Sequence, residues 1–128
     1  MPSPSNTLTI GLMSGTSLDG VDAVLLACSD HGMQCLGHTH LAFDPALRQA
    51  LDALNQPGTN ELHRAALAGN ALAHTLAQAV TLLLQRTQTP KHQVNAIGAH
   101  GQTVRHQPGQ HDGTGYTWHV PLPVWGAE

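Results

Sequence analysis

One segment decides the fold of this chain: residues Ile10–Asp22, which read IGLMSGTSLDGVD. Apolar, strand-like residues lead into a turn of small and hydroxyl residues, after which the chain becomes apolar again. Glycines bracket the turn at Gly15 and Gly20. Because short apolar runs joined by a glycine-bounded turn are typical of paired strands, the segment predicts a β-hairpin.

The residues between these glycines suit a phosphate ligand. Glycine lets a backbone approach a ligand closely, and consecutive amides with the hydroxyls of Thr16 and Ser17 offer hydrogen bonds to anionic oxygens. The turn contains no Lys or Arg, and Asp19 repels a bare phosphate, so the residue set indicates a nucleotide with Mg²⁺. The pattern is neither a Walker A loop nor a dinucleotide-binding fingerprint. From these residues alone, an ordinary Gly/Ser/Asp hairpin without a ligand is the alternative.

Composition limits the class of protein. The 128 residues fit one domain, and a hydrophobic content of 41% is enough for a modest core. A net charge of −3 with 10% charged residues gives no basic patch, which argues against a nucleic-acid partner. Met1–Asn6 carries no signal sequence, and no apolar run approaches the ~20 residues of a membrane helix. We therefore expect a soluble, cytoplasmic protein without a membrane partner.

Cysteines and histidines do not predict a metal centre. Cys28 and Cys35 are too few for a disulfide framework, so we expect reduced thiols buried in strands. The chain has ten histidines, of which His38 and His40 alternate along a predicted strand and share one face. No Cys or carboxylate stands near them in sequence at a spacing typical of metal ligands.

The hydrophobic pattern predicts the element order β-β-β-α-α-β. Three strands, at Thr7–Met13, Val21–Ala27 and Met33–Phe43, should form an antiparallel meander with a more exposed third strand. Asp44 and Pro45 begin a helix that Pro57–Gly58 ends.

A longer helix should follow from about Asn60 to about Arg86. Its apolar stripe is predicted at Leu62, Ala66, Gly69, Ala73, Leu76, Val80 and Leu83. Val94–Ala99 then reads as a short buried strand, reached most simply by a parallel crossover, and residues 109–115 read as a surface loop.

A second motif, IGAHGQTVRH, covers Ile97–His106 at the end of this last strand. Ligands of open α/β sheets bind beyond the carboxyl ends of the parallel strands. There His100 could move a proton, while Gln102 and Thr103 could hold the hydroxyls of a polar ligand. Arg105 could meet a carboxylate or a phosphate. The His and Gln side chains could equally satisfy backbone groups in a strand-to-loop turn.

Together, Met13–Asp22 and Gly98–His106 resemble one family, the anhydro-N-acetylmuramic acid kinases of bacterial cell-wall recycling. The resemblance implies an α/β fold: the N-terminal part of an actin-like, ribonuclease-H-like ATPase domain, incomplete, over residues 1–118. It implies ATP and Mg²⁺ at the hairpin and the sugar substrate, 1,6-anhydro-N-acetylmuramic acid, at the second motif. The implied ATP-binding residues are Gly15, Thr16, Ser17, Leu18, Asp19, Gly20, Val21 and Asp22, with Asp19 as the metal ligand. The implied sugar-side residues are His100, Gly101, Gln102 and Thr103.

Enzymes of this family open the 1,6-anhydro ring with water while they transfer the γ-phosphoryl group of ATP to O6, which yields N-acetylmuramic acid 6-phosphate. An Asp base activates the water, and Mg²⁺ with backbone donors stabilises the transferring group. The family is considerably longer than this chain, full-length relatives can be homodimers, and the catalytic Asp lies downstream, so we expect no catalytic residue here.

Residues 119–128 depart from the family pattern, and two prolines there oppose a central strand or a helix. The sequence therefore predicts a truncated, inactive part of such a kinase, with a divergent tail at 119–128. The alternatives are a non-catalytic nucleotide- or sugar-binding remnant and another sugar kinase of the same superfamily.

Overall fold

The computed structural model describes residues 7–123. Three antiparallel strands come first, as predicted: β1 (Thr7–Ser14), β2 (Gly20–Ser29) and β3 (Gly32–Ala42). Helices α1 (Pro45–Ala53) and α2 (Glu61–Thr87) follow, then a short 3₁₀ helix, η1 (Lys91–Gln93), and β4 (Val94–Ala99). β4 pairs in parallel with β1, so the predicted parallel crossover is confirmed and the sheet order is β3-β2-β1-β4.

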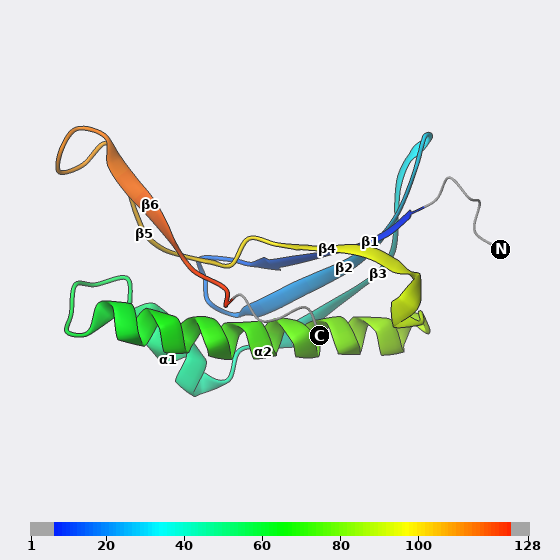
Figure 1. The fold of residues 1–128 in the computed structure, drawn as a ribbon, viewed down its shortest axis with the longest axis horizontal. Helices are drawn as coiled ribbons and strands as arrows, with labels where there is room; N and C mark the ends of the chain where they lie inside the picture. The colour runs from blue at the N-terminus through cyan, green and yellow to red at the C-terminus, as the bar shows by residue number, and fades with distance from the viewer. Residues whose placement is uncertain (1–6, 124–128) are drawn as a thin grey trace.

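Two further strands were not predicted. β5 (Gln102–Pro108) and β6 (Gly115–Val120) form a separate antiparallel hairpin, whose connection contains most of the expected 109–115 loop. Figure 1 shows both helices on one face of the four-stranded sheet and the β5–β6 hairpin projecting from its end. The elements agree with an N-terminal part of an actin-like ATPase domain.

The core lies between the sheet and the helices. Ile10, Val21 and Leu25 of the sheet and Leu51 and Leu72 of the helices are at most 1% exposed. Strand alternation places every second residue of β1 and β2 on the helix side, which is why these positions are apolar. Burial of such side chains is the main source of stability for a sheet covered by helices.

Helix α1 begins at Pro45 as predicted, and Asp44 is its N-cap residue, although the Asp44 side chain makes no capping hydrogen bond. The predicted face of α2 is wrong in part. Leu62 is 83% exposed and Ala66 is also exposed. The buried residues are instead Ala65, Ala68, Gly69, Leu72, Leu76, Ala79 and Leu83. The apolar face of the helix is wide, so more than one stripe satisfies the helical spacing, and only packing on the sheet decides between them.

By length and composition alone, α2 is also apolar enough to cross a membrane, which the sequence prediction had not anticipated. Its buried face packs on β2 and β3. The core helix of a globular domain meets the same criterion of length and composition.

Strand β4 was predicted to be buried, but the structure leaves it mostly exposed. Within residues 7–123 it pairs only with β1, so Ile97 is 53% exposed and the rest of the strand is open apart from the half-buried Val94. Cys35 is exposed as well, so the prediction of strand-buried thiols is wrong there, whereas Cys28 is half-buried; both are free thiols.

Only part of the predicted divergent tail lies within the described residues; 124–128 lies outside them, as does the N-terminal segment 1–6 that the signal-sequence prediction concerned. Val120 ends β6 and is 1% exposed, and Leu122 packs against the core. The chain crosses α2 at Gly69, where a Cβ would overlap the Pro121 carbonyl oxygen. The two described prolines therefore follow the strand without interrupting it.

Substitution of Gly20 by Ala should destabilise the fold. A Cβ at Gly20 would overlap the Leu41 carbonyl oxygen, which is backbone and cannot rotate away. We expect the Gly20→Ala change to lower the free energy of unfolding by about 1–3 kcal/mol in urea titrations. The matched control is Gly98→Ala, since nothing lies within 4 Å of a Cβ there. Equal stability of the two variants would contradict this close packing.

Candidate functional site

The two sequence motifs meet at one edge of the sheet. Leu12 of β1 pairs with Ala99 of β4, so the carboxyl ends of both parallel strands lie side by side, as predicted. The Ser14 hydroxyl donates to the Gly101 carbonyl oxygen at 3.2 Å. The Gln102 side-chain amide donates to the Gly15 carbonyl oxygen at 3.0 Å. These bonds join segments 87 residues apart, so the hairpin turn and the second motif form one unit.

The turn between β1 and β2 is held in place from both sides. The Leu18 amide donates to the Gly15 carbonyl oxygen at 3.2 Å, and the Phe43 amide donates to the Asp19 carbonyl oxygen at 3.1 Å. Leu18 adopts a left-handed backbone conformation, with φ of 57°, and its side chain is buried in the core. A non-glycine residue tolerates this conformation only when its surroundings fix it. The buried leucine therefore anchors the turn.

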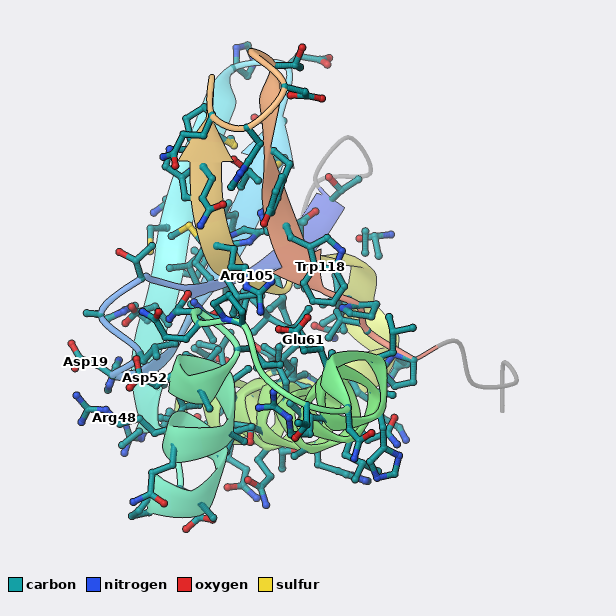
Figure 2. All side chains as sticks on the ribbon, turned by 90° about the vertical axis from the view of Figure 1, so that its left-hand side faces the viewer. Asp19, Arg48, Asp52, Glu61, Arg105 and Trp118 are labelled. Carbon is teal, nitrogen blue, oxygen red and sulfur yellow. The ribbon has the colours of Figure 1, made fainter. Side chains whose placement is uncertain are left out.

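The exposure of their side chains divides the predicted ATP-binding residues of the turn into two groups. The side chains of Leu18 and Val21 are buried, so only their backbone can meet a ligand. The remaining turn residues before β2 are exposed: Gly15, Thr16, Ser17 and Asp19. Figure 2 shows Asp19 at the periphery of the molecule, well apart from Arg105 and Glu61. The turn thus presents two hydroxyls and one carboxylate to solvent on a fixed backbone.

Asp22 lies on β2, just beyond the turn, and has partners that the sequence did not reveal. Its Oδ1 accepts hydrogen bonds from His40 Nδ1 at 3.0 Å and His38 Nε2 at 3.1 Å. Sequence spacing could not reveal this contact, because it crosses from β2 to β3. The hydrogen bond from His40, with that from His38, lowers the pKa of Asp22 below its ordinary value.

The lowered pKa gives a pH-dependent prediction. A carboxyl group whose pKa is lower in the folded state stabilises the fold at neutral pH, and this contribution is lost as the pH falls through the folded-state pKa. Asp22 is 44% exposed, so we expect Asp22→Asn to cost less than about 1 kcal/mol at pH 7. The cost should begin to fall near pH 3.8, the ordinary pKa of Asp, and should vanish once the pH lies below the lowered folded-state pKa. Urea titrations at several pH values measure it, and a cost independent of pH would contradict the assignment.

Gln102 and Thr103, which the sequence placed together on the sugar side, lie on opposite faces of β5. Gln102 is fully buried, pairs with Val120 and also donates to the Thr103 carbonyl oxygen at 3.2 Å. Its Oε1 atom has no hydrogen-bond partner within the described residues. Thr103 is half-buried and pairs with His119, whose ring lies edge-on to that of His100 with centroids 6.1 Å apart.

Arg105 meets a carboxylate, but one within the chain. It sits at a bulge in β5 with φ of 56°, and its side chain binds Glu61, the first residue of α2. Its Nε also donates to the Leu54 carbonyl oxygen at 3.0 Å. The hydrogen bonds from Arg105 and from the Gly58 amide lower the pKa of Glu61. No sequence spacing links these residues, so the contact could not be predicted.

Comparison with known proteins bears directly on this unit. The family model described as "Anhydro-N-acetylmuramic acid kinase" matches residues 7–120, which include both motifs and all six strands. The chain belongs to the anhydro-N-acetylmuramic acid kinase family. The resemblance stated from the two motifs is thereby confirmed.

Curated members of the family are close in sequence. The anhydro-N-acetylmuramic acid kinase of Variovorax paradoxus is 54% identical over 94% of this chain and 32% of its own length. The Ralstonia nicotianae kinase is 56% identical over 84% of this chain and 28% of its own length, and that of Cupriavidus metallidurans is 50% identical over 97% and 33%. This chain therefore spans about a third of the length of the kinases that it matches.

Proposed function

We propose that the chain forms one wall of the active-site cleft of an anhydro-N-acetylmuramic acid kinase, with the phosphates of ATP and Mg²⁺ bound at the Gly15–Gly20 turn. The observation that supports this most is the hydrogen-bonded junction between the turn and Gly101–Gln102 at the carboxyl ends of β1 and β4. Open α/β sheets bind ligands at this edge, and the junction holds both ligand-facing segments in one geometry.

On the phosphate side, the exposed hydroxyls of Thr16 and Ser17 and the backbone of the turn would donate to phosphate oxygens. Asp19 offers the carboxylate that suits Mg²⁺, and its exposure leaves room for a hydrated ion. When bound, Mg²⁺ neutralises charge on the phosphates. Gly20 allows β2 to begin against Leu41, and Asp22 is held by its two histidines at the start of the same strand.

On the sugar side, we assign direct contact with the sugar to His100 and Thr103. Gly101 lies between them and accepts the hydrogen bond from Ser14. Gln102 acts differently because its buried amide ties the second motif to Gly15. The reaction would be the ATP-dependent conversion of 1,6-anhydro-N-acetylmuramic acid to N-acetylmuramic acid 6-phosphate in peptidoglycan recycling, in the cytoplasm. The general base belongs to the two-thirds of the longer relatives that this chain does not match. Homodimer formation would likewise be a property of the full-length enzyme.

A non-catalytic remnant that binds nucleotide or sugar is the second candidate. A different sugar kinase activity is a third. Turnover assays distinguish the binding remnant from the anhydro-N-acetylmuramic acid kinase. A panel of sugars offered to a full-length relative distinguishes that kinase from another sugar kinase.

The sugar-side assignment is tested in a chimera in which residues 7–120 replace the matching segment of the Variovorax paradoxus kinase. We expect Thr103→Ala to raise the KM for the anhydro-sugar several-fold, since a lost hydrogen bond costs about 1 kcal/mol, and to leave the KM for ATP unchanged. Gln102→Ala should raise the KM values of both substrates, because it loosens the link to Gly15. If Thr103→Ala changed the KM for ATP and left the KM for the anhydro-sugar unchanged, the two motifs would have been assigned to the wrong ligands.

A further inference from the structure

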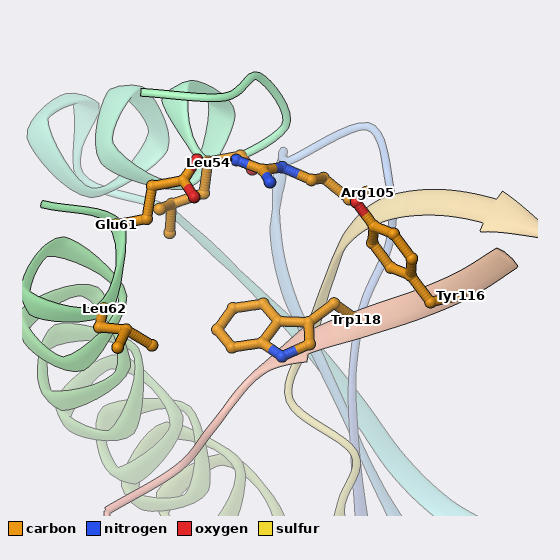
Figure 3. A pocket seen from close by; sticks show the side chains of 6 residues that line it. All are labelled: Leu54, Glu61, Leu62, Arg105, Tyr116 and Trp118. Carbon is orange, nitrogen blue, oxygen red and sulfur yellow. Dashed lines mark hydrogen bonds and ion pairs between the residues drawn. The ribbon is translucent and has the colours of Figure 1, made fainter. Parts of the chain in front are cut away.

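Arg105 binds the second motif to the connection between α1 and α2. Its backbone amide donates to Asn55 Oδ1 at 3.1 Å, and its guanidinium donates to the carbonyl oxygens of Leu54 at 3.0 Å and Gln56 at 2.8 Å. The guanidinium also binds the Glu61 carboxylate, and Figure 3 shows the two side chains directed towards each other. Both the backbone and the side chain of this arginine are therefore fixed.

The backbone of Arg105 is in an unfavourable conformation. Its φ of 56° is in the left-handed region, and it lies at the bulge between Val104 and His106 of β5. A residue with a β-carbon keeps such a conformation only where its surroundings fix it, whereas a glycine would adopt it readily. A bulge redirects a side chain, and here the guanidinium reaches the α1–α2 connection. The contacts of the guanidinium therefore explain why an arginine occupies this position.

Thr103, the residue that we assign to the sugar, lies between two fixed points. On one side, the buried Gln102 side chain donates to the Gly15 carbonyl oxygen at 3.0 Å. On the other side, Val104 is buried in the core and Arg105 is bound to the α1–α2 connection. The segment that contains Thr103 is thus held at both ends.

Helix α1 forms a second link between this segment and the β1–β2 turn. The Phe43 amide donates to the Asp19 carbonyl oxygen at 3.1 Å, and Phe43 lies two residues before α1 begins. The other end of α1 is capped by Leu54, whose carbonyl oxygen accepts from Arg105. The turn is therefore joined to β5 twice, directly through Gln102 and through α1 by way of Arg105.

We propose that Arg105 is a positioning residue that fixes Thr103 relative to the β1–β2 turn. Its importance for turnover rests on the proposed kinase function, which assigns the sugar to Thr103 and the phosphates to the turn. Transfer between two bound substrates depends on their separation and orientation, and a displacement of about 1 Å can lower the rate about 10²-fold. The Arg105 side chain is 17% exposed and its charge is paired with Glu61, so it acts within the protein and not on a substrate.

The test is a double-mutant cycle in the chimera that carries residues 7–120. We expect Arg105→Ala to lower kcat and to raise the KM for the anhydro-sugar about tenfold. The KM for ATP should stay within about twofold, because the turn keeps its own hydrogen bonds to Phe43 and Leu18. In a Thr103→Ala background, Arg105→Ala should change the sugar KM by less than about twofold, since Arg105 acts through Thr103.

Two further variants complete the cycle. Glu61→Gln keeps the size of the side chain and one acceptor, so it should raise the sugar KM by only about two- to threefold, and it replaces Arg105→Ala if that variant does not fold. Arg86→Ala is the control, because Arg86 is exposed in the last turn of α2, at the opposite end of that helix from Glu61. It should leave both KM values unchanged.

Additive losses in the double variant would overturn the proposal, because they would mean that Arg105 contacts the substrate itself or supports the fold in general. Equal rises of both KM values in Arg105→Ala would overturn it as well.

Amide hydrogen exchange of the ligand-free chimera gives a readout that does not depend on turnover. Arg105→Ala should speed exchange across residues 102–105 at least about tenfold, since these amides lose their support from the α1–α2 connection. This result with an inactive unmutated chimera would sustain the positioning of Thr103 and reject the kinase assignment. An active chimera in which Arg105→Ala alters neither exchange nor the sugar KM would reject the positioning role alone.

Discussion

The 128-residue chain alone will form no sugar phosphate above background when it is incubated with ATP, Mg²⁺ and 1,6-anhydro-N-acetylmuramic acid. Phosphoryl transfer depends on positioning and on electrostatic stabilisation from both sides of a closed cleft. The chain matches about a third of each kinase relative and offers one wall, the turn with its junction to Gly101–Gln102. Mass spectrometry of the products measures the outcome, with the intact Variovorax paradoxus kinase as the positive control.

Two outcomes of that assay would revise the account in different ways. Product that depends on the chain and disappears in Asp19→Asn would mean that a residue within this chain acts as the base. An inactive chain that still binds ATP with Mg²⁺ would agree with the proposed wall and also with a binding remnant. The chimera separates those two, because a remnant that has lost its catalytic geometry cannot support turnover there.

Asp19→Asn in the chimera should reduce kcat/KM by about 10²–10³-fold. The substitution keeps the size of the side chain and removes the charge that would hold Mg²⁺ beside the phosphates. The Asp19 side chain is exposed, so the fold should not change. Steady-state kinetics at saturating and limiting Mg²⁺–ATP measure the effect.

The matched control is Asp30→Asn, another exposed Asp, which follows the last residue of β2 and so lies at the opposite end of that strand from Asp19. It should leave kcat/KM unchanged within about twofold, because surface substitutions away from a site have small effects. Equal losses in both variants would point to a general effect of surface charge, and unchanged kinetics in Asp19→Asn would remove the metal role from that residue.

Local patterns were sufficient to predict the first two-thirds of the fold. Alternating apolar residues identified β1 to β3, and Asp44 with Pro45 located the start of α1. The parallel pairing of β4 followed from the rule for strands joined through helices. The same pairing predicted the edge of the sheet at which a ligand would bind, because that edge lies at the carboxyl ends of β1 and β4.

The parts that could not be predicted depend on contacts between distant residues. The bulge at Arg105 interrupts the alternation of β5, so the hairpin with β6 reads as a loop. The Asp22 contacts to His38 and His40 cross between strands, and the pair of Arg105 and Glu61 joins a strand to a helix 44 residues away. The exposure of β4 reflects the neighbours it has within residues 7–123, which no pattern in its own six residues encodes.

The most direct test of the central claim is the kinase activity of the unmutated chimera, in which residues 7–120 form the phosphate-binding wall of the Variovorax paradoxus enzyme. The account predicts formation of N-acetylmuramic acid 6-phosphate with a kcat/KM within about tenfold of the parent, since one factor of ten corresponds to about 1.4 kcal/mol of transition-state stabilisation. A folded chimera that binds the anhydro-sugar yet transfers no phosphate would contradict the claim that this chain carries a working phosphate site.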